Sequence, residues 1–369
     1  MPTDSTPPDS SSQLKQTDVF IGGQDGSHTY RIPSVIVAPN GELLAFCEAR
    51  RTTGSDTDDI DLVLKRSADG GASWSEMQVI WDDGPNTCGN PCAVVDQETG
   101  TVWLLACHNL VEDHESTIWE GVSRSTRTIW AIQSGDSGAS WSVPVEITSE
   151  TKASNWSWYA TGPGSGIQLQ HGDYKGRLVI PCDHGVAGGW DYHSHIFFSD
   201  DSGETWQLGG SVPDNTTSEC QVVELADGTL LLSIRYHGWV NQAEGTHYRT
   251  IAFSRDGGET WDDVRKDRGL IDPRCQASIF RHASGNAILF SNPANTARNR
   301  MTVRASFDEG ETWAASKMLH PGPSAYSCLT VLPDNSIGCF YERGEKQPSE
   351  KMTFARFTLE WLSDAQTSE

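Results

Sequence analysis

The sequence predicts an all-β protein, specifically a six-bladed β-propeller with almost no helix. Two internal repeats carry this prediction, one of tight turns and one of hairpins. A third observation concerns the number of domains: no stretch rich in Pro, Ser or Gly interrupts residues 19–362, whereas two separate sandwich domains would need a linker. We therefore expect residues 1–18 to be a disordered polar tail and residues 19–369 to form a single propeller domain.

The first repeat is a tight turn that occurs five times with the pattern S-x-D-x-G-x-[ST]-W. The copies span residues 67–74, 134–141, 199–206, 254–261 and 306–313, and they begin 52 to 67 residues apart. In such a turn an Asp accepts backbone N–H groups, a Gly supplies an open dihedral angle and a Trp packs beneath. None of the five fits the D-x-[DN]-x-[DN]-G calcium loop, so we expect a structural role for them.

The second repeat is a hairpin-like unit in which a polar turn separates two apolar runs. It occurs six times, at 32–46, 90–107, 162–182, 218–235, 276–292 and 327–342. Without the tail, each unit has about 58 residues, which suits the four antiparallel strands of a propeller blade. A propeller must close to hide its sheet edges, so residues 18–22 are expected to pair beside the last blade, which ends in the strand-like stretch 351–358.

The chain has 369 residues, with 27 basic and 50 acidic side chains and a formal net charge of −23. This balance argues against a general nucleic-acid binder and against electrostatic docking on an anionic membrane, because both need a basic surface. No apolar run approaches the roughly 20 residues that span a bilayer, and the N-terminus lacks the features of a signal peptide. We expect a soluble protein without a membrane anchor, either cytoplasmic or secreted with its signal peptide removed. The sequence leaves its oligomeric state open.

Cysteine and histidine positions do not predict a metal site. The nine cysteines are too sparse for a disulfide scaffold. Cys88 and Cys92 have C-x3-C spacing, but no second pair follows at zinc-site spacing, so the favoured interpretation is buried thiols. The histidine-rich stretch 192–195 also lacks further ligands at metal spacing. We expect neither a metal nor a cofactor.

The hairpins also predict where functional side chains gather. If they are the inner strand pairs of the blades, their turns lie on one face and their ends converge on the other. The residues at those ends are Arg31, Glu48, Arg50, Asp56, Tyr159, Asp183, His184, Glu219, Arg235, Arg298, Tyr326, Tyr341, Glu342 and Arg343. One arginine alone would be expected to pair with a local acid. Three in matching positions indicate an anionic ligand, since a guanidinium binds a carboxylate bidentately.

Over about residues 19–362 the chain resembles the non-viral exo-sialidases, or neuraminidases. The motifs that carry the resemblance are Tyr30-Arg31-Ile32-Pro33-Ser34, the five turns described above, known in that family as Asp boxes, and FCEARRTTGSD at 46–56. Further matches are Ser218-Glu219-Cys220, Ser233-Ile234-Arg235, Ser291-Asn292-Pro293 leading to Arg298, and Ala325-Tyr326-Ser327. A single Asp box occurs in other β proteins, whereas Arg-Ile-Pro followed by several boxes at blade spacing is specific.

The resemblance implies a role for each matching residue. Arg31, Arg235 and Arg298 are expected to hold the carboxylate of a sialic acid. Asp56 is the expected general acid/base, Tyr326 the nucleophile and Glu219 the carboxylate that takes its proton. Arg50 and Glu48, with Tyr159, are expected to contact the sugar ring. Two neighbours stay open as alternatives, Arg51 in place of Arg50 and Arg300 in place of Arg298.

A tyrosine nucleophile suits such a substrate, because the anomeric carbon already bears a carboxylate that would repel an anionic nucleophile. The ordinary phenol pKa of about 10 requires an adjacent base at pH 7, and sialidases with a Tyr nucleophile are a recognised exception to the two-carboxylate scheme of glycosidases. Partial desolvation is expected to keep Asp56 protonated often enough to act as the acid. The implied reaction is retaining hydrolysis of terminal sialic acid, or a related nonulosonic acid such as Kdn, from sialylated glycans through a tyrosyl-linked intermediate.

The alternative is a propeller lectin or interaction scaffold that binds acidic sugars without hydrolysis. Such a protein would need the arginines but not Tyr326, Glu219 and Asp56 together, and all three are present. Four tryptophans lie in polar connections outside the Asp boxes, where either stacking on sugar or plain packing is expected. They are Trp119, Trp156, Trp158 and Trp190. Residues 108–121 are the candidate wall facing carbon 5 of the sugar.

Overall fold

The computed structural model describes residues 14–189, 191–237, 247–282, 284–285 and 287–364. Within these residues the chain forms twenty-five strands and only short helical segments, which confirms the all-β prediction. The helical segments are α1 (Glu115–Glu120), α2 (Thr148–Thr151), α3 (Leu359–Ser363) and one 3-10 turn (Gly172–Tyr174). No helix in the described part of the chain is long and apolar enough to cross a membrane.

The strands of the described residues form four sheets, and most connections join neighbouring antiparallel strands. The first sheet contains β2 (Thr29–Val37), β3 (Leu43–Arg50), β4 (Ile60–Ser67), β5 (Gln78–Trp81), β6 (Thr87–Val95), β7 (Val102–Asn109), β8 (Thr128–Ser134), β9 (Val145–Glu146) and β11 (Gly164–Ser165). The second contains β10 (Trp156–Thr161), β12 (Ile167–Gln168), β13 (Leu178–Val186), β14 (Tyr192–Ser199) and β15 (Gln207–Ser211).

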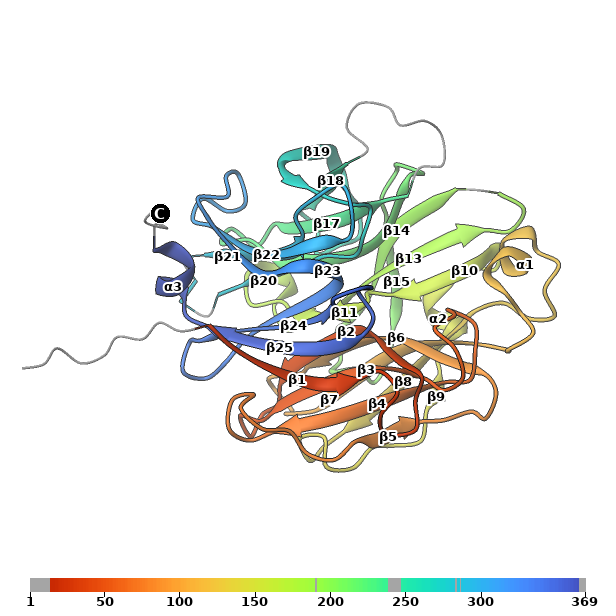
Figure 1. Ribbon diagram of the computed structural model, residues 1–369. Helices are drawn as coiled ribbons and strands as arrows, with labels where there is room; N and C mark the ends of the chain where they lie inside the picture. Colours follow the sequence, from red (N-terminus) through yellow and green to blue (C-terminus); the bar gives the residue numbers. More distant parts are fainter. Residues whose placement is uncertain (1–13, 190, 238–246, 283, 286, 365–369) are drawn as a thin grey trace, which may run out of the picture.

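The third sheet contains β16 (Thr217–Glu224), β17 (Leu230–Tyr236), β18 (Tyr248–Ser254) and β19 (Asp262–Ile271). The fourth contains β20 (Ser278–Arg281), β21 (Ile288–Pro293), β22 (Asn299–Ser306), β23 (Ala315–Val331), β24 (Ile337–Arg343), β25 (Lys351–Phe357) and β1 (Lys15–Ile21). The chain runs around the molecule, so the first and last strands lie side by side (Figure 1).

Pairing of β1 with β25 confirms the predicted closure of the two ends, but the strand begins earlier than expected. Lys15–Ile21 pairs antiparallel with Lys351–Phe357. Placing residues 15–18 in a disordered tail was therefore wrong, and residues 1–13 of that tail lie outside the described residues. The physical reason is Asp18, which accepts hydrogen bonds from Thr353 Oγ1 (2.7 Å), Arg343 Nη2 (2.9 Å) and Lys351 Nζ (2.9 Å) and thus anchors a polar stretch.

Five of the six predicted hairpins are antiparallel pairs, namely β2–β3, β6–β7, β16–β17, β20–β21 and β23–β24. The third, at 162–182, is divided. Gly164–Ser165 pairs in parallel with β6, whereas Ile167–Gln168 pairs with β13. Pro163 has no N–H to give to a ladder, and Gly162 and Gly164 have positive φ angles of 55° and 127°. The chain therefore crosses between two sheets here.

The five Asp-box turns share one hydrogen-bond pattern. In the first, Asp69 accepts from the Ser67 hydroxyl (2.8 Å), the Ser73 N–H (2.9 Å) and the Ser73 hydroxyl (2.6 Å), and Gly71 has a φ of 89°. The same contacts recur at Asp136, Asp201, Asp256 and Asp308. Each box joins two consecutive strands, such as β4 and β5, and the carboxylate of its Asp accepts its hydrogen bonds from within the turn. The predicted structural role is confirmed.

All nine cysteines are buried and free, as expected for thiols that pack in the core. Cys92 packs with Leu105, Ile180 and neighbouring residues, and Cys88 belongs to a second apolar cluster with Leu62 and Leu104. Among the described residues no group of three or more His, Cys, Asp or Glu side chains could hold a metal ion.

Candidate active site

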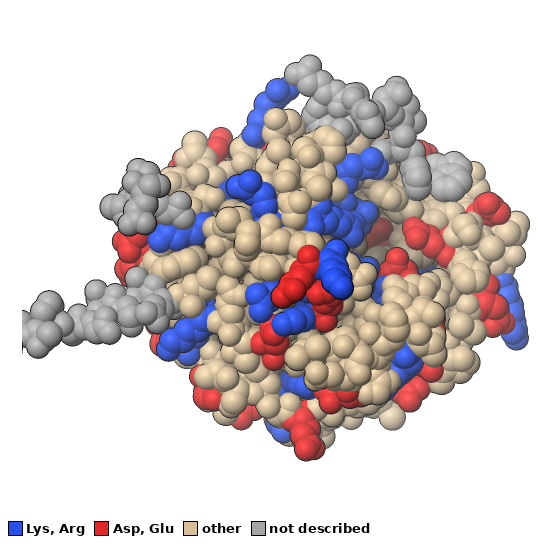
Figure 2. Space-filling model, viewed as in Figure 1, with Lys and Arg blue, Asp and Glu red and all other residues tan. Residues whose placement is uncertain are grey.

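A cavity of about 260 Å³ lies where the ends of several strands from different sheets meet. The sequence-predicted residues that line it are Arg31, Glu48, Arg50, Asp56, Glu219, Arg235, Arg298 and Tyr326. They come from β2, β3, β16, β17, β23 and two connecting loops, so the predicted convergence is confirmed for these eight. Figure 2 shows acidic and basic side chains mixed over the visible face, with a hollow right of centre that both kinds border. The basic groups of the cavity are thus a local feature of an acidic protein.

Arg31 is held in place by Glu342, a fully buried carboxylate on β24. Arg31 donates from Nε and Nη2 to the two Glu342 oxygens at 3.2 and 3.3 Å. The N–H groups of Ile32 (2.9 Å) and Tyr326 (3.3 Å) donate to the same carboxylate. Ile32 has a φ of 64°, an unusual conformation for a β-branched residue, which this contact helps to maintain. Glu342 therefore fixes Arg31 and the backbone at Tyr326 together.

Tyr326, Glu219 and Arg235 form the centre of the cavity. The Tyr326 hydroxyl donates a short hydrogen bond to Glu219 Oε1, and Arg235 Nη1 donates to Glu219 Oε2 (2.5 Å) and to the Tyr326 hydroxyl (3.1 Å). Burial and the Glu219 charge raise the pKa of Tyr326 well above 10, so the phenol is neutral. Burial raises the pKa of Glu219, but Arg235 and the Tyr326 hydrogen bond outweigh it and keep the carboxyl ionised. A neutral phenol thus faces an ionised carboxylate.

Two further guanidinium groups, those of Arg235 and Arg298, line the cavity. Arg235 Nε is buried and has no hydrogen-bond partner among the described residues. The Arg298 guanidinium lies 5.6 Å from the Tyr326 ring centroid and lines the cavity. Its neighbour Arg300, the alternative left open by the sequence, is exposed and outside the lining. The geometry therefore favours Arg298 as the third arginine.

Arg50, rather than Arg51, belongs to the cavity. Arg50 is buried and donates from Nε (3.0 Å) and Nη2 (2.7 Å) to Glu48 Oε2, and from Nη1 to the Gly54 carbonyl (2.8 Å). Glu48 Oε1 accepts from the Asn90 N–H at 2.8 Å. Arg51 turns away and donates from Nε to Asp61 at 2.6 Å. Adjacent residues at the end of β3 point in opposite directions, which separates the two arginines.

Asp56 lies on the loop after β3, with its side chain 67% exposed. Its Oδ1 is 2.7 Å from Arg50 Nη2 and 3.4 Å from Arg31 Nη1. Desolvation raises the pKa of Asp56, but Arg50 and Arg31 outweigh desolvation and hold this pKa below its ordinary 3.8. The expectation that desolvation would keep Asp56 protonated is therefore wrong.

Tyr159 does not line the cavity. It is fully buried in the core and its hydroxyl lies 2.9 Å from His195 Nε2. Its neighbours Trp158 and Ala160 line the cavity instead, because side chains alternate between the faces of β10. The sequence assignment was wrong by one residue. Trp158 is thus placed where it could contact a sugar.

Other residues named from the hairpin ends lie outside the lining. Asp183 and His184 are buried on β13, with His184 stacked on Trp156 at 3.3 Å between ring centroids. The Tyr341 hydroxyl and the Arg343 guanidinium bind β1, at Gln16 and Asp18 respectively. Trp119 packs beneath the cavity wall against Tyr192, with ring centroids 4.0 Å apart, and Trp190 lies outside the described residues.

Several lining residues had no individual role assigned from the sequence. They are Ile32, Asn90, Glu115, Arg127, Tyr192, Ser218 and His237. Glu115 falls within the candidate wall 108–121, and its Oε1 accepts a hydrogen bond from the Tyr192 hydroxyl at 3.1 Å. Arg127 is buried, with its guanidinium carbon 4.4 Å from the Trp158 ring centroid. Arg127 lies outside every motif named from the sequence, and the fold places it in the cavity lining.

Comparison with known proteins agrees with this geometry. The family model described as a BNR repeat-like domain matches residues 41–339. An exo-alpha-sialidase from Aspergillus fumigatus is 30% identical and covers 91% of this chain, which in turn covers 86% of that protein. The chain belongs to the sialidase family. A sialidase from Micromonospora viridifaciens is 34% identical over 96% of this chain, and the chain spans only 55% of that relative's length.

A solved structure of the family, the Hadza microbial sialidase Hz136, superimposes with a TM-score of 0.81 at 30% identity. The match covers 92% of this chain and 68% of Hz136. The β-propeller fold predicted from the repeats fits this sialidase neighbour.

Proposed function

We propose that this sialidase-family chain is a retaining exo-glycoside hydrolase. Its substrates are glycans with terminal sialic acid or a related nonulosonic acid such as Kdn. The observation that carries the proposal is the Tyr326–Glu219 hydrogen bond inside a cavity lined by Arg31, Arg235 and Arg298. A binding module would gain nothing from a buried phenol placed against an ionised carboxylate. The named sialidases among the relatives support the same reaction class.

Substrate binding begins with the carboxylate. The guanidinium groups of Arg235 and Arg298, together with the Arg31 guanidinium anchored by Glu342, line one cavity and offer a preorganised site for one planar anion. Because these side chains are already ordered, little conformational entropy is lost when the anion binds. Glu48 and Arg50 contact ring hydroxyls of the same sugar.

In the first chemical step the Tyr326 oxygen attacks the anomeric carbon while the bond from that carbon to the aglycone oxygen breaks. Glu219 accepts the phenolic proton, and Asp56 gives its proton to the departing oxygen. In the second step water attacks the same carbon, Asp56 takes a proton from that water, and Tyr326 leaves and regains its proton from Glu219. Two displacements at one carbon give net retention. Every proton is carried by a named side chain, so the scheme requires no cofactor.

Asp56 can act as the acid only if binding raises its pKa. Arg50 and Arg31 lower that pKa. A bound substrate carboxylate pairs with Arg31 and adds a negative charge near Asp56, and both effects favour the protonated carboxyl. Substrate binding would thus convert Asp56 into the protonated form that acts as the general acid.

The test compares wild type, Tyr326→Phe and the control Tyr174→Phe on fluorogenic α-glycosides of Neu5Ac and of Kdn. Tyr174 lies on the 3-10 turn outside the cavity. We expect at least 10³-fold loss of kcat for Tyr326→Phe, since removing a nucleophile costs this order of rate, and unchanged activity for Tyr174→Phe. A wild-type protein that binds sialosides but cleaves neither glycoside would support the lectin alternative.

We also propose that the propeller has six blades. The strand order supports successive four-stranded groups β2–β5, β6–β9, β10 with β13–β15, β16–β19 and β20–β23. The last group consists of the end of β23 with β24, β25 and β1. The long strand β23 would serve two blades, pairing with β22 through its first half and with β24 through its second.

A further inference from the structure

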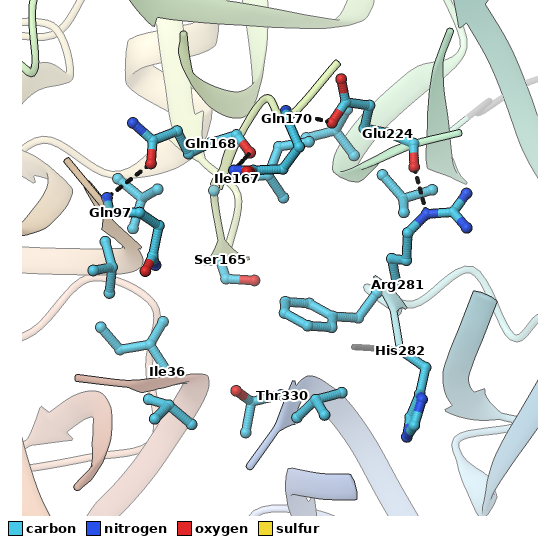
Figure 3. A pocket seen from close by; sticks show the side chains of 18 of the residues that line it. Ile36, Gln97, Ser165, Ile167, Gln168, Gln170, Glu224, Arg281, His282 and Thr330 are labelled. Carbon is cyan, nitrogen blue, oxygen red and sulfur yellow. Dashed lines mark hydrogen bonds between the residues drawn. The ribbon is translucent and has the colours of Figure 1, made fainter. Parts of the chain in front are cut away.

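A second cavity, of about 480 Å³, opens at the opposite ends of the same inner strands (Figure 3). Strand β2 carries Arg31 near its start and Ile36 near its end, and β16 carries Glu219 and, four residues later, Val223. At about 3.3 Å per residue these positions on β16 are about 13 Å apart. The second cavity is therefore separate from the proposed active site, and the proposed reaction does not use it.

The walls of the second cavity are mainly apolar. They include Ile36, Val95, Val222, Val223, Phe280 and Val331, contributed by β2, β6, β16, β20 and β23. The volume would hold on the order of ten waters, and walls of this kind offer them few hydrogen-bond partners. Displacing poorly bonded waters with an apolar group favours binding. The volume also falls within the roughly 300–1,000 Å³ of small-molecule sites.

The charged side chains of this cavity are already used within the protein. Arg281 donates from Nε to the Glu224 carbonyl (2.8 Å) and from Nη1 to the Gly285 carbonyl (3.0 Å) and to Glu309 Oε1 (3.2 Å). The Glu224 carboxylate accepts the N–H groups of Gln170 (2.7 Å) and His171 (3.0 Å). Neither Arg281 nor Glu224 is therefore free to compensate for the desolvation of a charged ligand.

Neutral polar side chains line the cavity both in its interior and at its rim. Ser165 and Thr330 are buried residues that carry hydroxyls into the cavity, and Ser165 lies at the centre of the ring of side chains in Figure 3. Gln97 is exposed at the rim, and its carboxamide forms no hydrogen bond with a described residue. Gln170 stands on another side of the rim with its carbonyl oxygen available. Hydroxyls and carboxamides bind neutral oxygen-rich groups.

We propose that this cavity binds a neutral amphipathic small molecule of the alkyl-glycoside class. The alkyl chain would occupy the valine- and isoleucine-lined interior, and the sugar hydroxyls would meet the carboxamides of Gln97 and Gln170. Because Arg281 and Glu224 are both paired within the protein, the cavity selects against carboxylates and ammonium ions of the same length.

The test is calorimetric titration with octyl β-glucoside below its micelle-forming concentration, with octanoate as the charged probe. Val331→Trp and Val37→Trp each place a large ring in the cavity from a half-buried position on different strands. Val143→Trp is the matched control, because Val143 is 79% exposed and outside the lining. Thermal melting and sialoside cleavage report whether each variant is folded.

We expect saturable one-to-one binding of octyl glucoside by wild type and Val143→Trp, and at least tenfold weaker binding by each folded variant with a filled cavity. Octanoate should bind wild type at least tenfold more weakly than octyl glucoside. Equal binding by the filled variants, or equal affinity for octanoate, would overturn the proposal. The lack of saturable binding by wild type would mean that the cavity holds only water and would also overturn it.

Discussion

Glu342 provides the most direct test of how the cavity is held together. Its carboxylate accepts four hydrogen bonds, from Ile32 N–H (2.9 Å), Arg31 Nε (3.2 Å), Arg31 Nη2 (3.3 Å) and Tyr326 N–H (3.3 Å). In Glu342→Gln, one oxygen remains for Ile32 and Arg31 Nε. The other becomes an NH₂ group that faces two donors, Arg31 Nη2 and the Tyr326 N–H.

The size of the effect follows from these contacts. A buried donor left without its acceptor costs about 1–3 kcal/mol, so two donors cost about 2–6 kcal/mol. The long distances and the 15% exposure of the Arg31 side chain place the expected loss near the lower end, at about 3 kcal/mol. We expect this loss to appear partly as a lower free energy of unfolding and partly as weaker binding of the substrate carboxylate. A share of about 1.5–2.5 kcal/mol in binding corresponds to a roughly 10- to 100-fold fall in kcat/KM.

The assay measures kcat and KM on an aryl sialoside and the urea unfolding midpoint for wild type, Glu342→Gln and Glu345→Gln. Glu345 undergoes the same chemical change three residues along the chain, at an exposed position. KM should rise more than kcat falls, since Arg31 binds the substrate carboxylate in both the ground and the transition state. The reasoning is refuted if Glu342→Gln matches Glu345→Gln in both kcat/KM and unfolding midpoint.

Three further predictions concern other residues. Asp56→Ala should slow cleavage of natural sialosides far more than that of activated aryl sialosides, because only poor leaving groups need protonation; equal losses in kcat/KM would contradict the acid role. Gly185→Ala should lower the free energy of unfolding by about 2–4 kcal/mol, because a Cβ there would lie 1.6 Å from Trp119 Cη2, whereas Gly135→Ala, with open space around it, should be neutral in urea unfolding. Asp183 is fully buried, and desolvation raises the pKa of its carboxyl well above 3.8 in the folded state. The unfolded chain therefore releases this proton first as pH rises, so wild-type stability falls relative to Asp183→Asn above about pH 4, and unfolding midpoints of the two should converge at lower pH; a constant difference across pH would contradict this.

The parts of the fold that the sequence predicted well are those held by nearby residues. In each Asp box the Asp binds groups two and four residues away. The residues of the motif therefore form the turn by themselves, without contacts from distant parts of the chain. The hairpins likewise pair strands that are adjacent along the chain. The third hairpin departed from the pattern because Gly162 and Pro163 lead the chain across to β6, a contact with a strand about 70 residues earlier.

The residues of the cavity also divide into those that the sequence identified and those that depend on contacts between distant segments. Arg31, Asp56, Glu219, Arg235, Arg298 and Tyr326 stand in motifs specific enough to be recognised one by one, and the structure brings them together. Tyr159 was misassigned because the direction of a side chain on β10 depends on how that strand pairs with β13. Glu342 was placed at a hairpin end from the sequence, but its hydrogen bond with Arg31 joins residues 311 positions apart and could not be predicted.

The all-β class, the box turns and eight of the residues that line the cavity thus follow from the sequence alone, since they depend on local hydrogen bonding and on side-chain chemistry. The tertiary structure decided which of two neighbouring residues faces the cavity and which charge dominates at Asp56. It also decided that a second, apolar cavity lies at the far ends of the same strands. These depend on distances between segments far apart in the chain, and Coulomb energies and packing change steeply with such distances.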